Sequence, residues 1–217
     1  MTDWKPQYSV KDVAVENDSC VYQGFFRMHE LTLTHATFKG KKLTIKREMF
    51  RRGSAVTVLL FDPIKERLVL IEQFRAGALS APQGPWLLEL VAGMVEEGET
   101  PEVVAERETL EEAGLTVHHL QPIQGYLPSP GGMDEWIHLL YGFVNSSDAQ
   151  GLHGLAEEGE DIRVHCLAVQ DVFELMHQGR LDNAAILIAV QWLYINYQTV
   201  HQRGLECMQN DETQIYT

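Results

Sequence analysis

The sequence predicts an α/β (α+β) fold in which a mixed β-sheet lies between helices and follows a β-rich N-terminal extension. Apolar and polar residues alternate in the first fifty positions, as at Leu31 and Leu33, which is typical of strands with one buried face. Short apolar runs bounded by turn-forming residues follow at 55–61, 67–74 and 86–92. The pattern then changes to helix signals, so strands and helices share one domain.

The first 53 residues are expected to form a small β domain. Lys39-Gly40-Lys41 supplies a turn, and the alternation resumes at Leu43-Thr44-Ile45, which predicts a hairpin. A piece of this size is not expected to be stable by itself, so it should pack against something else. A larger domain is predicted over 54–203, and a polar C-terminal tail over 204–217.

A helix is predicted over 101–113 from the signals at its two ends. Thr100 is a suitable N-cap, Pro101 takes the first helical position, and Glu102 places an acid in the first turn. Gly114 stands where a C-cap glycine belongs. Further strands are predicted at 115–127, 136–144 and 161–168. Further helices are predicted at 170–177, ended by Gly179, and from the Asp182-Asn183 cap to about Arg203.

The net charge of −14 limits the partners that the protein can take. An acidic surface repels nucleic acid and anionic membranes, so neither is an expected partner. It repels phosphorylated substrates as well, unless divalent cations lie between the two anions. The most apolar stretch, 184–195, is shorter than the ~18 residues of a membrane span. Three widely spaced cysteines indicate neither a metal site nor a disulfide framework, and a cytoplasmic location is expected.

The helix at 101–113 carries an unusual cluster of acids. Glu108 and Glu112 are four residues apart on one face, and Glu111 lies beside them. Like charges at these spacings destabilise a helix by roughly 0.2–0.5 kcal/mol per pair. A solvated helix face is one interpretation of such a cluster. A divalent cation is the other, because it makes the same arrangement favourable through the carboxylate oxygens that Mg²⁺ and Mn²⁺ bind.

The spacing around this helix resembles the Nudix box. The matching positions are Gly93, Glu99, Arg107-Glu108, Glu111-Glu112, Gly114 and the apolar Leu115. One position departs from the pattern, because Thr109 stands where an aliphatic or small residue is usual. We expect this departure to affect packing rather than metal binding. The resemblance implies a Nudix fold and the cleavage of a diphosphate.

The resemblance also implies roles for individual residues. Glu108 and Glu112 match acids that ligate the metal directly, and the backbone carbonyl of Ala92 matches a further ligand. Arg107 lies four residues before Glu111 and can pair with an acid to fix its rotamer. We therefore expect Arg107, Glu111 and Glu112 to be catalytic. Gly93 is expected to allow a tight loop that brings the backbone close to the metals.

A second resemblance, to bacterial ADP-ribose pyrophosphatases, narrows the substrate. Pro130 lies sixteen positions after Gly114 in a Ser-Pro-Gly context, as in that branch of the family. Other similar segments are Tyr22–Phe26, Lys46–Glu48, Glu72–Arg75 and Gly154–Val164. The implied reaction is the hydrolysis of ADP-ribose to AMP and ribose 5-phosphate, with two or three Mg²⁺ (or Mn²⁺) per site.

This resemblance assigns the substrate contacts as well. Phe25 and Arg47 would hold the adenine, since an aromatic face and a guanidinium plane both suit a flat base. Arg75 would meet phosphate, and Glu135 the terminal ribose. One adenine contact comes from the partner subunit in this family, in a homodimer with exchanged N-terminal domains. Hairpin core for Phe25 and a solvated strand edge for Arg47 are the alternative interpretations.

Two acids in a glycine-containing loop complete the expected site. Glu158 matches a glutamate that activates or orients the attacking water, and Glu160 matches one that contacts metal. Water needs such help because it is a poor nucleophile at neutral pH. Two alternative functions remain: hydrolysis of another nucleoside-diphosphate sugar, such as GDP-mannose or a UDP-sugar, and a non-catalytic sensor with the same fold. Sensors often lose the metal-binding acids, which this sequence keeps.

Overall fold

The computed structural model describes residues 3–155, 157 and 159–215, with side chains described as far as residue 209. The chain forms two compact units. The first contains the residues up to Gly53 together with Leu127–Glu135. The second contains Ser54–Tyr126 and the residues from Trp136 onward. The predicted domain boundaries placed 127–135 with the larger domain, whereas its contacts lie within the first unit.

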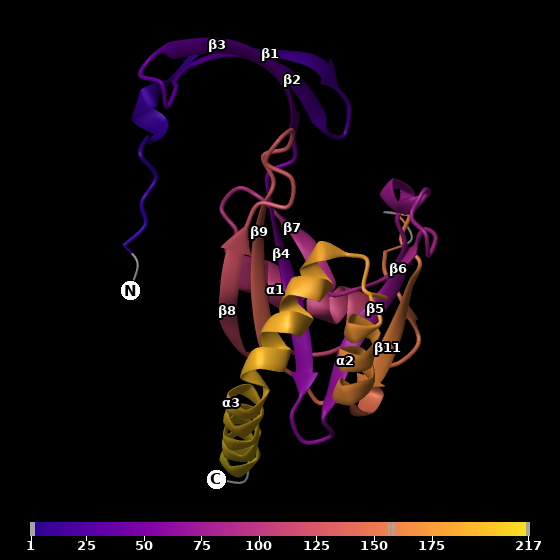
Figure 1. The fold of residues 1–217 in the computed structure, drawn as a ribbon. Coiled ribbons are helices and arrows are strands. Elements are labelled where there is room, and N and C mark those ends of the chain that lie inside the picture. Colours follow the sequence, from indigo (N-terminus) through magenta and orange to yellow (C-terminus); the bar gives the residue numbers. More distant parts are fainter. Residues whose placement is uncertain (1–2, 156, 158, 216–217) are drawn as a thin grey trace. The chain divides into compact units, whose positions relative to one another are not determined.

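The first unit is built on a three-stranded antiparallel sheet in the order β1-β2-β3 (Figure 1). Its strands are β1 (Val13–Gln23), β2 (Arg27–Ala36) and β3 (Lys42–Arg51), preceded by a 3-10 turn at Val10–Asp12. The predicted hairpin is confirmed, with Gly40 at φ 72° in the turn between β2 and β3. Among the described hydrophobic residues of this unit, Leu31 alone is buried, at 7% exposure. The sheet therefore has almost no core of its own.

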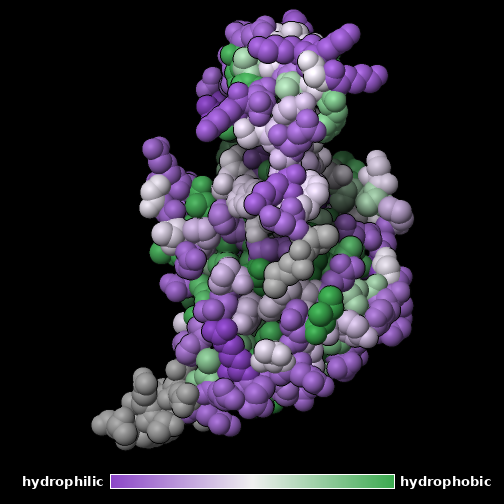
Figure 2. All heavy atoms as spheres, turned by 60° about the vertical axis from the view of Figure 1, so that its left-hand side comes forward, coloured by the Kyte–Doolittle hydropathy of each residue, from purple (hydrophilic) through white to green (hydrophobic). Residues whose placement is uncertain are grey.

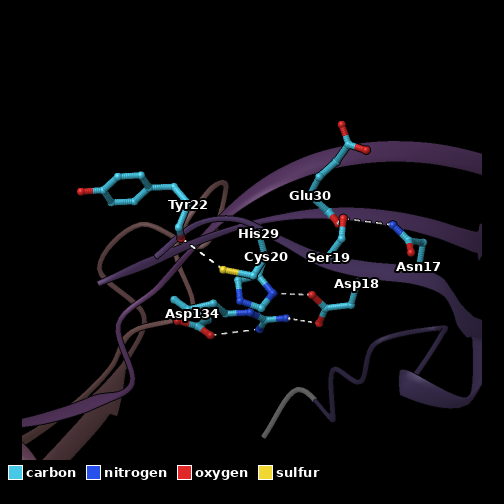
Figure 3. A network of polar contacts seen from close by, with 9 residues as sticks. Asn17, Asp18, Ser19, Cys20, Tyr22, His29, Glu30 and Asp134 are labelled. Carbon is cyan, nitrogen blue, oxygen red and sulfur yellow. Dashed lines mark hydrogen bonds and ion pairs between the residues drawn. The ribbon is translucent and has the colours of Figure 1, made fainter. Parts of the chain in front are cut away.

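The loop 127–135 attaches to the end of β3. The Phe50 amide donates to the Gly132 carbonyl, and the Asp134 amide donates to the Phe50 carbonyl. Arg51 joins two carboxylates, those of Asp134 at 3.0 Å and Asp18 at 2.8 Å. Asp18 also contacts His29, so this network connects all three strands to the loop (Figure 3).

The second unit contains a mixed eight-stranded sheet in the order β10-β11-β5-β4-β9-β8, with β6 paired to β5 and β7 to β4. The strands are β4 (Ser54–Asp62), β5 (Arg67–Phe74), β6 (Trp86–Glu89), β7 (Val91–Val95), β8 (His118–Tyr126), β9 (Trp136–Phe143), β10 (Leu152–His153) and β11 (Ile162–Ala168). The β4–β9 pair is parallel and the others are antiparallel. The single strand predicted at 86–92 is wrong: the chain changes partner strand at Leu90, which an apolar run does not reveal.

Helices cover both faces of this sheet. The helices are α1 (Pro101–Ala113), α2 (Val169–His177) and α3 (Ala184–Ile215), with 3-10 turns at Ala76–Ala78 and Ser146–Asp148. On β4, Val58 and Leu60 pack in the cluster that contains α1, whereas Leu59 and Phe61 pack in the cluster that contains α2 and α3. Burial on both faces explains the unbroken apolar runs. The predicted mixed sheet between helices is confirmed.

The last helix is longer than predicted. It continues past Arg203 to Ile215, so the predicted end near Arg203 is wrong. Gly204 allows this continuation, because a Cβ there would lie 2.7 Å from Pro63 and 2.9 Å from Phe143. Cys207 and Met208 then pack against the same core cluster. Within the described part of the chain, no helix is both long and apolar enough to cross a membrane.

Candidate active site

Local signals define the helix that carries the acidic cluster. The Thr100 hydroxyl accepts a hydrogen bond from the Val103 amide at 3.4 Å, and Pro101 is the first helical residue. Gly114 ends α1 in the left-handed conformation at φ 66°. The predicted bounds of the helix are therefore confirmed. Its inner face packs on the sheet through Val104 and Ala105, and this orientation turns the cluster toward β7.

Glu112 is the most enclosed acid of the cluster, with only 2% of its surface exposed. Its Oε2 accepts a hydrogen bond from the Ala92 amide at 3.0 Å. Burial raises the pKa of Glu112 to about 8, and the negative charges of Glu108 and Glu160 act in the same direction. The Ala92 amide and Arg75 oppose this rise. Removing water from a carboxylate without a full counter-charge explains the direction.

Glu108 lies beside Glu112 and faces β7. Burial raises the pKa of Glu108 to about 7, Arg107 opposes the rise, and Glu111 and Glu160 reinforce it. A Cβ at position 93 would overlap the Glu108 carboxylate, so only glycine fits there. Gly93 is part of strand β7 rather than of a tight loop. The reason for glycine is thus the close approach of Glu108, which corrects the sequence-based expectation.

Arg107 contacts the exposed side of the cluster. Its Nη1 lies 2.8 Å from Glu108 Oε1 and 3.3 Å from Glu111 Oε2, and its Nη2 lies 4.0 Å from Glu99 Oε1. Glu111 lies one turn from Arg107 on the same face, as its spacing indicated. Arg107 thus fixes the rotamers of two acids at once.

The carboxylates of this region form an oxygen-rich donor set that suits a hard divalent cation. The negative charges of Glu108 and Glu160 raise the pKa of Glu112, and that of Glu160 also raises the pKa of Glu108, so the three carboxylates lie within electrostatic reach of one another. Within the described residues, no three such side chains are already arranged as a metal cage. Each carboxylate instead has a protein partner, and that of Glu160 is the Leu155 amide at 3.1 Å. A cation would therefore draw these side chains away from their present partners.

Arg75 follows the end of β5, near the acidic cluster. Its positive charge lowers the pKa of Glu112, which places the guanidinium within electrostatic reach of that carboxylate. Arg75 Nη2 also lies 2.9 Å from Oε2 of Glu89, a buried acid on β6. Glu89 is not among the site residues predicted from the sequence. A charged residue inside the apolar run 86–92 was the signal that could have identified it.

The two predicted adenine contacts lie apart in the first unit. Phe25, 87% exposed, lies in the turn between β1 and β2 and packs edge-on against Phe26. Arg47 lies on β3 opposite Leu31, and its Nη1 donates to the Lys46 carbonyl. Arg27, near that turn, is four residues from Leu31 along β2, which corresponds to about 13 Å of strand. Within one chain, the structure does not bring Phe25 and Arg47 together.

Pro130, Glu135 and Glu158 are the remaining residues predicted for the site. Pro130 is exposed in the loop 127–135. Glu135, at the end of that loop, is 7% exposed, and its Oε1 lies 2.6 Å from Arg52 Nε. Burial raises the pKa of Glu135, and Arg52 opposes that rise. Glu158 lies outside the described residues.

The structure brings together the features of the Nudix box: the acidic cluster, Gly93 and the capped helix α1. The comparison with protein families identifies the same segment. The model of the NUDIX domain matches residues 51–188, well over half of the chain. The chain belongs to the Nudix family.

The Nudix protein is also similar to individual characterised relatives. It is 43% identical to the ADP-ribose pyrophosphatase of Escherichia coli (strain K12) over 89% of this chain and 93% of that protein. It is 41% identical to the ADP-ribose pyrophosphatase of Haemophilus influenzae over 93% of this chain and 98% of that protein. A GDP-mannose pyrophosphatase of Salmonella arizonae is 27% identical over 86% of this chain and 97% of that protein.

A solved structure supports the fold of this Nudix protein. A crystal structure of an ADP compounds hydrolase superposes with a TM-score of 0.63 and covers 87% of this chain and 97% of that one. The two sequences are 18% identical, so the likeness concerns the fold alone.

The departure from the Nudix box at Thr109 is expected to have little effect on stability or activity. Thr109 is fully buried, and its hydroxyl donates to the Ala105 carbonyl at 2.6 Å, one turn earlier in α1. That carbonyl keeps its helical partner if the hydroxyl is removed. We therefore expect Thr109→Val to be neutral or to stabilise the fold by up to about 1 kcal/mol. Urea denaturation measures this change, and a loss above about 1 kcal/mol would contradict it.

Proposed function

We propose that this Nudix protein hydrolyses ADP-ribose to AMP and ribose 5-phosphate with the help of a divalent cation. The observation that carries the proposal is the 41–43% identity to ADP-ribose pyrophosphatases over 89–93% of the chain. That similarity extends beyond the residues that the NUDIX model matches. The acidic cluster on α1 supports the same reaction, because a diphosphate needs a counter-charge in an acidic protein and these acids can hold a cation.

We assign the cation to the acidic cluster. Glu108, Glu112, Glu160 and the Ala92 carbonyl would hold it, with two or three Mg²⁺ or Mn²⁺ in each site. A divalent cation supplies neutralisation of the diphosphate and lowers the pKa of water. Arg107 keeps the neighbouring acids in fixed rotamers through its contacts with Glu108 and Glu111.

The other residues act on the substrate and the attacking water. Arg75 binds a phosphate group through its guanidinium. Glu158 accepts a proton from the water as its oxygen bonds to phosphorus. The P–O bond of the diphosphate bridge then breaks, which releases AMP and ribose 5-phosphate. Glu112 and Glu111, the latter in contact with Arg107, would complete the catalytic set by holding the cation that neutralises the diphosphate.

Glu158→Gln is expected to reduce turnover by about 100-fold while the affinity for substrate changes little. Loss of a general base removes an interaction that matters in the transition state rather than in the bound ground state. Comparison of kcat and of the dissociation constant of ADP-ribose tests this role. If only binding becomes weaker, Glu158 is a substrate contact and not the base.

We propose further that the active form is a homodimer, in which Phe25 and Arg47 of different subunits hold one adenine. The separation of these residues within one chain supports this idea. Exposed hydrophobic side chains on the three-stranded sheet, visible among hydrophilic ones in Figure 2, support it too. They include Val15, Val21 and Tyr22 on β1, and Phe38 in the turn between β2 and β3 adds to them. Sedimentation at micromolar concentration should give a dimer, whereas a monomer would exclude a shared site.

A cytoplasmic, small-molecule function fits the remaining features. All three cysteines are free, and Cys20 is exposed, which suits a reducing compartment. Glu135 would contact the terminal ribose of the substrate, and Pro130 would be part of the substrate-binding site. The net charge of −14 argues against nucleic acid and membrane partners.

The experiment that tests the function measures nucleotide release from ADP-ribose, ADP-glucose, GDP-mannose, UDP-glucose and NADH, with Mg²⁺ and then with EDTA. The proposal requires that ADP-ribose is cut fastest and that EDTA abolishes cleavage. Fastest cleavage of GDP-mannose or UDP-glucose would keep the metal assignment and overturn the substrate. No cleavage in the presence of metal would favour a non-catalytic sensor.

A further inference from the structure

Glu89 is a buried carboxylate that none of the proposed roles uses. It is 4% exposed on β6, next to strand β5. Three side chains donate to it: Gln73 Nε2 at 3.2 Å and Arg75 Nε at 3.0 Å to Oε2, and Asn183 Nδ2 at 2.7 Å to Oε1. Both oxygens are thus engaged, and the acid links β5, β6 and the start of α3.

Stability by itself does not account for this charge. The residues on either side of Glu89 in the chain, Leu88 and Leu90, pack in the hydrophobic core. Replacing a buried ion pair by apolar residues of similar volume is often neutral or stabilising. A buried carboxylate at the end of β6, within an apolar segment, therefore points to a role in holding its partner.

The partner, Arg75, is held along one edge only. Its Nε and Nη2 both contact Glu89 Oε2, at 3.0 and 2.9 Å. Among the described residues, its Nη1 has no hydrogen-bond partner, and 44% of the side chain is exposed. The free edge of a guanidinium fixed in this way is a preorganised donor for a phosphate oxygen. The same guanidinium lies within electrostatic reach of Glu112.

We propose that Glu89 is the positioning residue for phosphate recognition: it holds Arg75 so that Nη1 faces the diphosphate. The identity of the diphosphate rests on the proposed function, whereas the pairing rests on the contacts of Glu89. Without the carboxylate, Arg75 is free to rotate, and ordering it again costs part of the binding free energy. Glu89 acts through Arg75 and does not touch the substrate.

The first test is Glu89→Gln, with equilibrium binding of ADP-ribose and of ADP to the protein in EDTA, and kcat/KM in Mg²⁺. We expect the affinity for ADP-ribose, the affinity for ADP and kcat/KM each to fall by about 10- to 100-fold, as is typical of residues that orient a functional group. Glu72→Gln is the matched control, because Glu72 is a β5 carboxylate paired with His165 instead of Arg75. It should leave binding and kcat/KM unchanged.

A double-mutant cycle with Arg75→Gln separates positioning from a general structural role. If Glu89 acts through Arg75, Glu89→Gln should have no further effect on nucleotide binding in the Arg75→Gln background. Losses that add in full would overturn the inference, and so would unchanged binding in Glu89→Gln. Glu89→Asp, which keeps the charge but shortens the side chain, should show a smaller loss and serves if Glu89→Gln does not fold.

The two proposals fail in different ways. If ADP-ribose is not hydrolysed but ADP binding shows the expected coupling, the proposed function is wrong and the positioning role stands. If ADP-ribose is hydrolysed and the two substitutions act independently, the proposed function stands and the positioning role of Glu89 is wrong. If the unaltered protein binds neither nucleotide in EDTA, Arg75 does not recognise phosphate and the inference is wrong.

Discussion

Glu112→Gln is expected to lower turnover by about a thousandfold or more while the fold stays intact. The amide oxygen can still accept the hydrogen bond from the Ala92 amide, so the local structure is kept. The negative charge that binds a cation is lost, and metal-assisted stabilisation of the transition state amounts to several kcal/mol. Steady-state kinetics in Mg²⁺, together with circular dichroism, measures both parts of this expectation.

The matched control is Glu106→Gln on the same helix. Glu106 is exposed on α1, two residues before Glu108, and has no part in the proposed site. Glu106→Gln removes the same charge from the same helix and should leave turnover unchanged. An active Glu112→Gln protein would refute the metal assignment. Equal losses in the two variants would indicate a general effect of charge.

The metal-free protein is expected to lose stability as the pH rises from 6 to 8. The pKa of Glu112 is about 8 in the folded chain, above the ordinary value of 4.5 that applies when the chain is unfolded. Between these values the folded state holds a proton that the unfolded state has released, so stability falls with rising pH. A full pH unit of this difference amounts to about 1.4 kcal/mol, and because Glu112 is half ionised at pH 8 the loss from Glu112 alone is about 2 kcal/mol. Urea denaturation in EDTA at both pH values tests this.

Two comparisons identify the group responsible. Glu112→Gln cannot ionise at this position, so its stability should depend less on pH and should exceed that of the unaltered protein at pH 8. Saturating Mg²⁺ should also reduce the pH dependence, because a cation binds the ionised carboxylates. A stability that is constant or rises between pH 6 and 8 in EDTA would show that Glu112 is ionised in the metal-free fold.

The sequence predicted those features that depend on nearby residues. Thr100, Pro101 and Gly114 specify the ends of α1 through contacts within one helical turn, and the structure confirms both ends. The family assignment followed from the same segment, since its acids and its glycine have a fixed spacing. The apolar runs at 55–61 and 67–74 indicated strands, and the structure has β4 and β5 there, with residues in both core clusters.

Features that depend on distant residues could not be predicted in this way. The apolar run 86–92 does not encode a change of partner at Leu90. Gly204 is required in α3 by the close approach of Pro63, far away in the sequence, and is not a signal for the end of the helix. Glu89 was overlooked because its donors, Arg75 and Asn183, come from other segments. The residue roles assigned by resemblance remain proposals.

The attachment of the loop 127–135 to β3 has a consequence for protein engineering. The first unit is discontinuous, since its second piece lies within the residues that the NUDIX model matches. A chain shortened to begin at Ser54 would leave the Gly132 carbonyl and the Asp134 amide without their Phe50 partners. A chimera that takes residues 1–53 from a relative must therefore also take 127–135. Because Arg51 and Asp134 form an ion pair, a chimera should take both of these positions from the same homologue.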